Sequence, residues 1–409
     1  MAIFGKKSKG ETNNFISLDI GTEFVKTLIC DIKDDNVIIY GYGKVRQPLN
    51  AMRGGVVTNI KSVISTCQKS IDLAMEEVGE NIEKTPDKVV VGIAGELVKG
   101  VGIKINYERE NPEDKIDDAE IKSILEKVHE TAYDEAIKKF TLSTGSDKTQ
   151  IKLINATVTD TYIDDYKVST PIGFQGKKVT LNIYFVYTPL IFAGALDDIL
   201  KELKLTPIVI AVQPFAIARS VKGARDISFD AIIIDIGGGT SDVAIVSQGT
   251  FQDTQMFAMG GRSFTKRIAS DVGISYEDAE KLKIEYAENE LDKAKSLQLR
   301  DAIKKDLDLW ISGIEIALEE MENIKVYPDQ ILLCGGGSKL TEIRTKLVEY
   351  PWSVILPFHR NPKINFLSPE KIDGIIDKTL KLTKPEDVTP VSLARIVLDI
   401  IKDDVIIAI

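Results

Sequence analysis

The sequence of 409 residues is poor in the residues on which several kinds of chemistry depend, with three cysteines, two histidines and two tryptophans. Cys30, Cys67 and Cys334 are far apart and lie in apolar runs, which predicts buried free thiols in a reducing compartment. No Cys-x-x-Cys pair or Cys/His cluster occurs, so nothing indicates a zinc site. His129 and His359 are expected at the surface, which argues against histidine-dependent nucleophilic catalysis.

Long apolar runs and a basic charge balance are also missing. No run of about 18 apolar residues occurs, so no transmembrane helix is expected. The first residues contain no apolar stretch of the length found in a secretory signal, and the expected location is therefore cytoplasmic. The formal net charge is −10. Sequence-independent binding of nucleic acid needs a basic surface, so nucleic acid is not an expected partner.

Two common phosphate-binding signatures are absent as well. The chain has no Gly-x-x-x-x-Gly-Lys-Ser/Thr sequence, which excludes a P-loop protein. It also has no Gly-x-Gly-x-x-Gly after its first predicted strand, which argues against a dinucleotide-binding dehydrogenase. The hydrophobic fraction of 44% is nevertheless ample for a large core, and the length predicts two or more domains.

The chain does contain an internal repeat. Leu-Asp-Ile-Gly at 18–21 is followed by a second apolar run, and Ile-Asp-Ile-Gly at 234–237 is followed by Gly-Gly-Thr-Ser-Asp and another apolar run. Both read as a strand, a tight turn and a second strand. A repeat about 200 residues long is too long for a solenoid, so it predicts an α/β protein of two related lobes.

The repeated turns have the composition of a phosphate site. Three consecutive glycines, Gly237 to Gly239, let the backbone approach a ligand, and their N–H groups form an anion-binding concavity to which Thr240 adds a hydroxyl. Asp19 and Asp235 precede the turns, and carboxylates there suit Mg²⁺, which Asp242 could also reach. For the first turn alone, an ordinary hairpin is the favoured interpretation.

A third glycine turn, Cys334-Gly-Gly-Gly-Ser338, follows a predicted strand and precedes a helix expected from about 339.

Between the lobes, residues 97–188 read as a separate module with a strand, a helix (117–139) and two strands, at 151–168 and 177–187. The expected division of the chain is a flexible basic tail (1–13), the first lobe core (14–96), this insertion (97–188), the first lobe continued with a connector (189–225), the second lobe core (226–259), an outer helical subdomain (260–328), the second lobe core continued (329–385) and a C-terminal helix that returns to the first lobe (386–409).

Two Asp-Ile-Gly hairpins and a late triple-glycine turn, in this order, resemble the actin-like ATPase superfamily, whose fold is two duplicated lobes around a nucleotide cleft. Within it, residues 15–380 are similar to the bacterial cell-division family FtsA. The segments that carry the likeness are Gly54–Ile60, the strand-helix-strand-strand insertion with Tyr162–Tyr166 and Pro171–Gly173, and Gly260-Gly261 followed by Ala279–Lys283.

The resemblance implies ATP and Mg²⁺ as cofactors, and it assigns a role to each matching residue. The first phosphate loop would hold Asp19, Gly21 and Thr22, and the second Asp235, Gly237, Gly238, Gly239 and Thr240, with Asp242 beside it. Asp19 and Asp235 would hold Mg²⁺, mostly through water. The nucleoside would lie near Gly261, Glu280, Lys283, Gly335, Gly336 and Gly337. Gln213 matches the water-orienting glutamine of actin, where FtsA-like chains often have an acid, and with Asp19 and Asp235 it completes the candidate catalytic set.

The function implied is that of an ATP-binding scaffold that forms filaments and links the FtsZ ring to the inner face of the cell membrane, through the FtsZ C-terminal peptide and other division proteins. Whether ATP is hydrolysed stays open. The family usually ends in a basic amphipathic helix, but here three aspartates outweigh Arg395 and Lys402 over 391–409, so a packed final helix and strand are expected. The basic start, 1–13, is either a free tail or a weak contact with anionic lipid.

Two alternatives remain. The PilM family, cytoplasmic adaptors of type IV pilus assembly, resembles FtsA and carries the same insertion. Other actin-like ATPases, such as sugar kinases and chaperones, lack that insertion, which makes them the third interpretation.

Overall fold

The two Asp-Ile-Gly sequences lie at equivalent places in two sheets, in which five corresponding strands have the same order. The structure is a computed structural model that describes residues 13–95, 98–145, 149–168, 170–224, 226–321, 324–401 and 406–408. The first sheet has the order β11-β6-β1-β2-β3-β17 and the second the order β16-β15-β12-β13-β14. In both, the strand before the turn (β1 or β12) is parallel to one neighbour and antiparallel to the other. The duplication expected from the repeat is therefore present.

The strands of the first sheet are β1 (Phe15–Ile20), β2 (Phe24–Lys33), β3 (Asn36–Arg46), β6 (Lys88–Ile93), β11 (Thr206–Val212) and β17 (Ile375–Asp377), with a small hairpin of β4 (Met52–Arg53) and β5 (Val56–Val57) beside them. Those of the second are β12 (Ala231–Ile236), β13 (Ser241–Ser247), β14 (Thr250–Phe257), β15 (Gln330–Cys334) and β16 (Lys363–Phe366). Every residue of β1 and of β12 is buried, as expected for central strands covered on both faces.

Helices cover both faces of the first sheet. Thr27 of β2 bonds to Ser70 of α1 (Ile60–Val78), while Ser17 of β1 donates to the backbone oxygen of Pro390 in α10 (Val388–Arg395). Because side chains alternate along a strand, Asp19 points to the same face as Ser17, toward α10. The other helices of this lobe are α3 (Leu190–Glu202), α4 (Gln213–Ser220) and α11 (Val397–Ile401).

Helix α1 approaches β3 so closely that two glycines are required. A Cβ on Gly43 would lie 1.9 Å from the backbone oxygen of Ser70, and one on Gly41 would lie 2.0 Å from that of Ala74. We expect Gly43→Ala to lower the free energy of unfolding by about 2 to 3 kcal/mol, because α1 must move away from the sheet. Urea unfolding measures this change. Gly102→Ala is the control, since a Cβ there meets nothing within 4 Å, and an equal loss in both variants would contradict the explanation.

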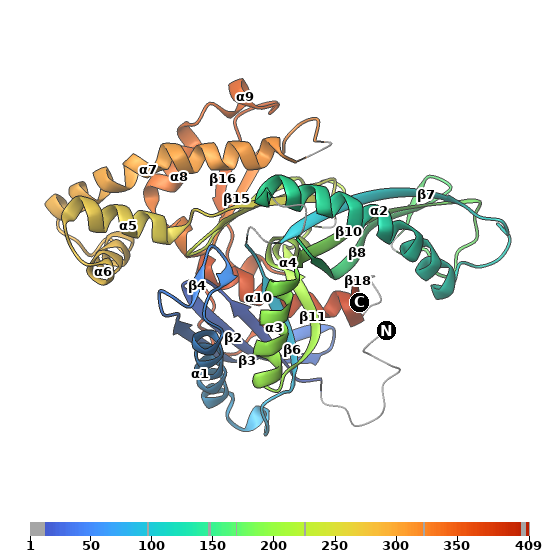
Figure 1. Cartoon of the computed structure of the whole chain (residues 1–409), viewed down its shortest axis with the longest axis horizontal. Helices are drawn as coiled ribbons and strands as arrows, with labels where there is room; N and C mark the ends of the chain where they lie inside the picture. The colour runs from blue at the N-terminus through green and yellow to red at the C-terminus, as the bar shows by residue number, and fades with distance from the viewer. Residues whose placement is uncertain are drawn as a thin grey trace.

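The insertion forms a separate sheet with the order β18-β8-β10-β7 and extends to the right in Figure 1. Its elements are β7 (Lys99–Glu108), α2 (Asp118–Thr144), β8 (Ile151–Ile163), β9 (Tyr166–Val168) and β10 (Lys178–Pro189). The single strand expected over 151–168 is wrong, because the chain reverses at Asp164 and Asp165, which both have positive φ. The Asp164 carboxylate accepts bonds from the backbone N–H groups of Lys177 and Lys178, which ties this turn to the start of β10.

The second lobe carries the outer helices α5 (Gly261–Val272), α6 (Tyr276–Ala287) and α7 (Lys293–Glu319), together with α8 (Thr341–Glu349) and α9 (Trp352–Ile355). The buried Trp310 of α7 donates from its indole nitrogen to Ser241 at 2.9 Å, which anchors α7 on β13. The helix expected from about 339 begins at Thr341, because the glycine turn continues as a 3-10 turn, η2. The 3-10 turns of the chain are η1 (Gly79–Asn81), η2 (Gly336–Lys339), η3 (Pro369–Lys371) and η4 (Pro385–Asp387).

The chain crosses between the lobes at two places, and the crossings lie side by side. Val221 and Ile372 form an isolated antiparallel bridge, and Lys222 donates to the backbone of Lys371 at 2.8 Å. The chain returns to the first lobe earlier than expected. Residues 329–385 are expected in the second lobe, but β17 within them pairs with β3 of the first sheet. After η4 the chain forms two short helices instead of one, and β18 (Ile406–Ala408) joins β8 of the insertion.

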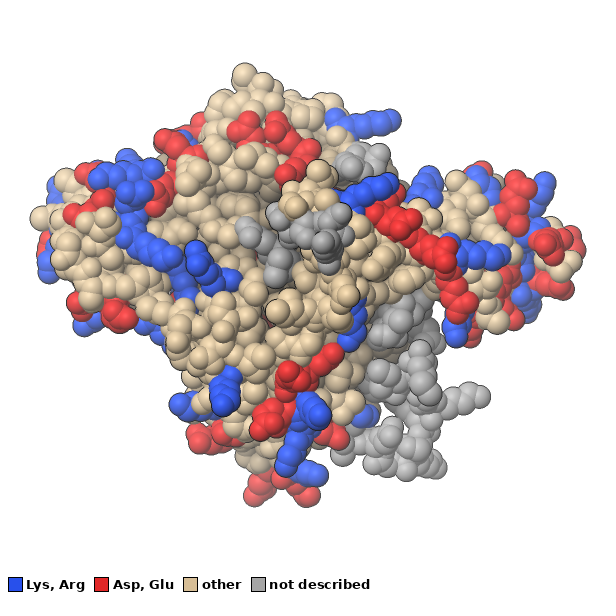
Figure 2. All heavy atoms as spheres, in the orientation of Figure 1, with Lys and Arg blue, Asp and Glu red and all other residues tan. Residues whose placement is uncertain are grey.

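The remaining expectations concern single residue types and the surface. The three cysteines are free and buried, as predicted. His359 is exposed, but His129 is half-buried and its ring lies 6.2 Å from that of Tyr187. In the part of the chain that the structure describes, no helix combines the length and the hydropathy needed to cross a bilayer. The tail expected over 1–13 lies, apart from residue 13, outside the described residues. Acidic and basic side chains are intermingled on the face that Figure 2 shows.

Candidate functional site

A cavity of about 290 Å³ lies between the lobes, and both glycine hairpins line it. The structure brings almost all of the predicted site residues to this cavity: Asp19, Gly21, Thr22, Gln213, Asp235, Gly237, Gly238, Thr240, Asp242, Gly261, Glu280, Lys283, Gly335, Gly336 and Gly337. Gly239 is not among the lining residues, because it packs against Thr22 of the opposite turn. The volume is close to the lower end of small-molecule pockets, about 300 Å³.

The first hairpin places a lysine opposite its aspartate. In the antiparallel register of β1 and β2, Asp19 pairs with Lys26, whose ammonium lies 3.6 Å from the carboxylate. Gln213, the first residue of α4, donates its amide to the other oxygen of Asp19 at 2.8 Å. Asp19 is therefore bound by Lys26 of the sheet and by Gln213 of the connector between the lobes.

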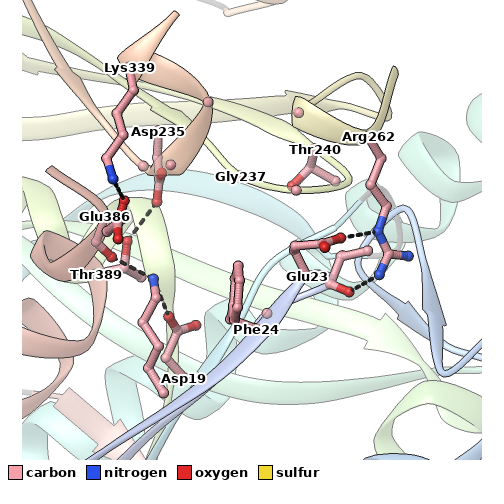
Figure 3. Close-up of a pocket in the computed structure, with 18 of the residues that line it drawn as sticks. Asp19, Glu23, Phe24, Asp235, Gly237, Thr240, Arg262, Lys339, Glu386 and Thr389 are labelled. Carbon is pink, nitrogen blue, oxygen red and sulfur yellow. Dashed lines mark hydrogen bonds and ion pairs between the residues drawn. The ribbon is translucent and has the colours of Figure 1, made fainter. Parts of the chain in front are cut away.

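The second hairpin places an aspartate where the first has a lysine. Asp235 pairs with Asp242 in the register of β12 and β13, so two buried carboxylates share one face of this hairpin. Thr389 of α10 donates to Asp235 at 2.7 Å (Figure 3). Thr240 bonds to one oxygen of Asp242 at 3.4 Å. The other oxygen of Asp242 is buried and has no hydrogen-bond partner.

The burial of three neighbouring aspartates makes their ionised forms costly. Burial raises the pKa of Asp19 to about 6, against the pull of Lys26 and with a contribution from the charge of Asp235. Burial also raises the pKa of Asp235, and burial together with the nearby Asp235 raises the pKa of Asp242 well above its usual value. A cation that entered here would offset this repulsion.

The tips of the two hairpins touch. A Cβ on Gly238 would lie 2.6 Å from the Cβ of Glu23, so glycine is needed for the turns to approach. Arg262, in the first turn of α5, reaches from the second lobe to the first and donates to the Glu23 carboxylate and to the Thr22 backbone oxygen, both at 2.6 Å (Figure 3). Arg46 binds the other carboxylate oxygen of Glu23 at 2.7 Å. Glu23 thus joins the lobes.

The third glycine turn lies against the second hairpin. Gly335 has a φ of +79°, and a Cβ there would lie 2.2 Å from a carboxylate oxygen of Asp235. Its N–H donates to the backbone oxygen of Pro385 at 3.1 Å, which ties the turn to η4. The glycines of this turn therefore serve the close packing of β15, Asp235 and η4.

Glu280 and Lys283 form a buried pair on α6. The Lys283 ammonium lies 2.7 Å from the Glu280 carboxylate and donates to the backbone oxygen of Gly261 at 3.0 Å. Thr265 donates its hydroxyl to the same carboxylate. Both residues line the cavity from the outer subdomain, on the side of Gly261.

The cavity also contains residues that the sequence reasoning missed. They are Ile20, Glu23, Phe24, Lys26, Lys44, Gly55, Ala94, Arg262, Ile284, Ala287, Glu288, Lys339, Leu340, Lys384, Glu386 and Thr389. A signal for Lys26 was present, because a residue seven positions after Asp19 lies opposite it across a tight hairpin. Arg262 directly follows the Gly260-Gly261 pair, and Lys339 directly follows the third glycine turn. Nothing local indicates Glu386 or Thr389.

The donor set fits a polyphosphate with Mg²⁺. Mg²⁺ is typically held by one or two carboxylates and several waters, and the unpartnered oxygen of Asp242 beside Asp235 matches that requirement. Among the described residues no group of three or more side chains forms a ready-made metal cage, so most ligands of such an ion would be water or phosphate. The glycine turns and lysines on both sides supply the contacts that phosphate oxygens accept.

Known proteins resemble this chain in sequence. Residues 232–350, which include the second hairpin, the outer helices and the third glycine turn, match a family model described as cell division protein FtsA. The chain resembles FtsA. The FtsA of Pseudomonas aeruginosa is 25% identical over 371 residues, which cover 84% of this chain and 83% of that protein. The FtsA of Neisseria meningitidis serogroup B is 27% identical over 272 residues, which cover 66% of this chain and 60% of that FtsA.

The fold is also that of a solved structure, the PilM-PilN type IV pilus biogenesis complex. The TM-score is 0.63 at 15% sequence identity, over 93% of this chain and 97% of that chain. The predicted fold class, an actin-like ATPase fold, is confirmed, and the sequence likeness to FtsA is the one that the residues indicated.

Proposed function

We propose that this chain binds Mg-ATP between its lobes and works as an FtsA-like protein of cell division. The observation that carries the proposal is the pair of duplicated hairpins whose glycines and buried aspartates face one cavity from opposite lobes. The likeness to FtsA over most of the chain supports the role in division.

The residues take the following roles in this proposal. The turns after Asp19 and Asp235 bind the phosphates from both sides, with Lys26 as the cation of the first hairpin. Asp235 and Asp242 hold Mg²⁺ with water, and Asp19 orients that water. Glu280, Lys283 and the Gly335–Gly337 turn bind the nucleoside. Gln213 orients a water for attack on the terminal phosphate, although its hydrogen bond to Asp19 is compatible with a purely positioning role.

The proposed cellular role follows the FtsA resemblance. Bound ATP joins the lobes in one closed arrangement, and copies in that arrangement assemble into filaments at the cytoplasmic face of the membrane. Division proteins, the FtsZ C-terminal peptide among them, are the proposed partners. Turnover of ATP is expected to be slow or absent, because a scaffold depends on occupancy of the site rather than on its rate.

Electron microscopy of the purified chain on an anionic lipid monolayer, with and without Mg-ATP, tests this function. We expect filaments on the lipid only with Mg-ATP. Calorimetric titration of the same sample with Mg-ATP measures binding by itself. Absence of binding would refute the proposal, whereas binding without filaments would favour an adaptor role of the kind that PilM has, or recruitment by another membrane protein. An ATPase activity that depends on an added sugar would favour a sugar kinase.

A further inference from the structure

The cations that line the cleft are already paired with carboxylates of the chain itself. Among the described residues that line the cavity, Lys26 pairs with Asp19, Arg262 with Glu23, Lys283 with Glu280 and Lys384 with Glu288. Lys44 and Lys339 share one partner, Glu386. A polyphosphate that enters the cleft must therefore compete with internal anions for these cations.

Glu386 differs from the other carboxylates in its position. One of its oxygens lies 2.8 Å from the ammonium of Lys44, which comes from β3 of the first lobe. The other oxygen contacts Lys339, which comes from η2 of the second lobe, and Figure 3 shows these two side chains pointing toward one another. The backbone oxygen of Glu386 accepts a bond from Lys26. One residue thus engages three lysines from both walls of the cleft.

The Glu386 carboxylate is an anion at neutral pH. Burial raises its pKa, but the hydrogen bonds from Lys339 and Lys44 outweigh burial and lower the pKa to about 2. The side chain is only 12% exposed, so its interactions with the two lysines are weakly screened by solvent. The backbone beside it is held in place, because the backbone oxygen of Pro385 accepts the N–H of Gly335, so displacement would have to move the side chain alone.

We propose that Glu386 is an internal competitor of the phosphates, which holds Lys44 and Lys339 until a polyphosphate displaces it. The proposal rests on the proposed function. Glu386 bridges the lobes and occupies cations that a triphosphate would otherwise use. Displacement frees Glu386 and transfers Lys44 and Lys339 to the ligand, so the affinity that is measured is lower than the lysines alone would give.

The test compares the full chain with its Glu386→Gln variant, which keeps the shape of the side chain and removes the charge. We expect Mg-ATP and inorganic tripolyphosphate to bind about tenfold more tightly to the variant, as for a modest coupling between two competing anions. Adenosine, which has no phosphate, should bind both proteins equally. The control is Glu77→Gln, which removes the same charge from an ion pair with Lys381 outside the cavity and should leave every affinity unchanged.

Two outcomes would overturn the proposal. Equal affinity of Glu386→Gln and the unchanged chain for Mg-ATP would refute the competition and leave the ATP site intact. Absence of Mg-ATP binding to both would refute the competition and the proposed function together. If Glu386→Gln proves unstable, Glu386→Ala replaces it in a second measurement, the rise in melting temperature that Mg-ATP induces. This rise should be larger for Glu386→Ala than for the unchanged chain. A Lys44→Gln background should reduce the gain, because Glu386 acts through that lysine.

Discussion

The Asp19→Asn variant is expected to unfold at a higher temperature than the unchanged chain at pH 7.5 and to bind Mg-ATP about 100-fold more weakly. Asp19 is 4% exposed, and its pKa lies at about 6 in the folded chain instead of 3.8. A raised pKa means that the folded state binds the proton more tightly than the unfolded state. The stability that this proton linkage contributes is present below pH 3.8 and is lost as pH rises through 6.

At pH 7.5 the buried charge therefore costs about 3 kcal/mol, from a shift of about two pKa units. Asparagine removes that cost, so the gain in unfolding free energy should approach this value at pH 7.5 and shrink as pH falls from 6 toward 4. The loss of Mg-ATP affinity, ~3 kcal/mol, is at the upper end of what a hydrogen bond to a charged group contributes. Thermal unfolding and calorimetry at several pH values measure both effects.

For the unchanged chain, affinity for Mg-ATP should rise with pH through about 6, as Asp19 ionises. In Asp19→Asn this dependence should disappear. A variant that melts lower than the unchanged chain and still binds Mg-ATP normally would show that the Asp19 charge serves the packing of the hairpin and takes no part in binding.

Arg262→Ala should separate the lobes. The guanidinium is 12% exposed and bonds to Glu23, to the backbone oxygen of Thr22 and, at 3.0 Å, to that of Met52. All three acceptors belong to the first lobe, whereas Arg262 belongs to α5 of the second. Removal of one partner of a buried ion pair commonly costs 3 to 5 kcal/mol, so we expect a loss of about 3 kcal/mol in unfolding free energy. X-ray scattering of the ligand-free chain should show a larger radius of gyration.

The matched control is Arg267→Ala, five residues further along the same helix. Arg267 pairs with Asp306 of α7 inside the second lobe, at 2.7 Å, and its side chain is 38% exposed. Exposed pairs contribute roughly 0 to 1 kcal/mol, so this variant should change stability little and should not change the scattering. If both variants expand the molecule equally, the bond across the lobes is not what holds them together.

The sequence predicted the parts of the site that are formed locally. An aspartate, a tight glycine turn and a second strand are neighbours in the chain, so their composition alone indicates a phosphate-binding hairpin. The sequence did not predict two short strands. Strand β9 follows two aspartates inside a run that alternates like a single strand, and β17 has only three residues. An element of that length has too few residues for a pattern, and its neighbour β3 is more than 300 residues earlier in the chain.

Sequence spacing also fails to predict the contacts that line the cleft, because their partners are far apart in the chain. Lys44 contacts Glu386 across 342 positions of sequence, and Thr389 contacts Asp235 across 154. Neither contact is encoded by spacing, because each depends on how α10 and η4 pack between the lobes. The ordinary appearance of Lys44 and Glu386 in the sequence gives no sign of the ion pairs that Glu386 forms with both lobes.

The early return of the chain to its first sheet has a consequence for biosynthesis. Strand β3 acquires its neighbour β17, and the face of β1 and β2 acquires α10, only after the entire second lobe has been made. Roughly 350 residues separate β2 from α10, so at about 5 to 20 residues per second the ribosome needs roughly 20 to 70 s to supply the missing parts. During that interval the face of β1 and β2 that carries Ser17 and Asp19 lacks its contacts with α10. The half of the molecule that is synthesised first is therefore the half that is completed last.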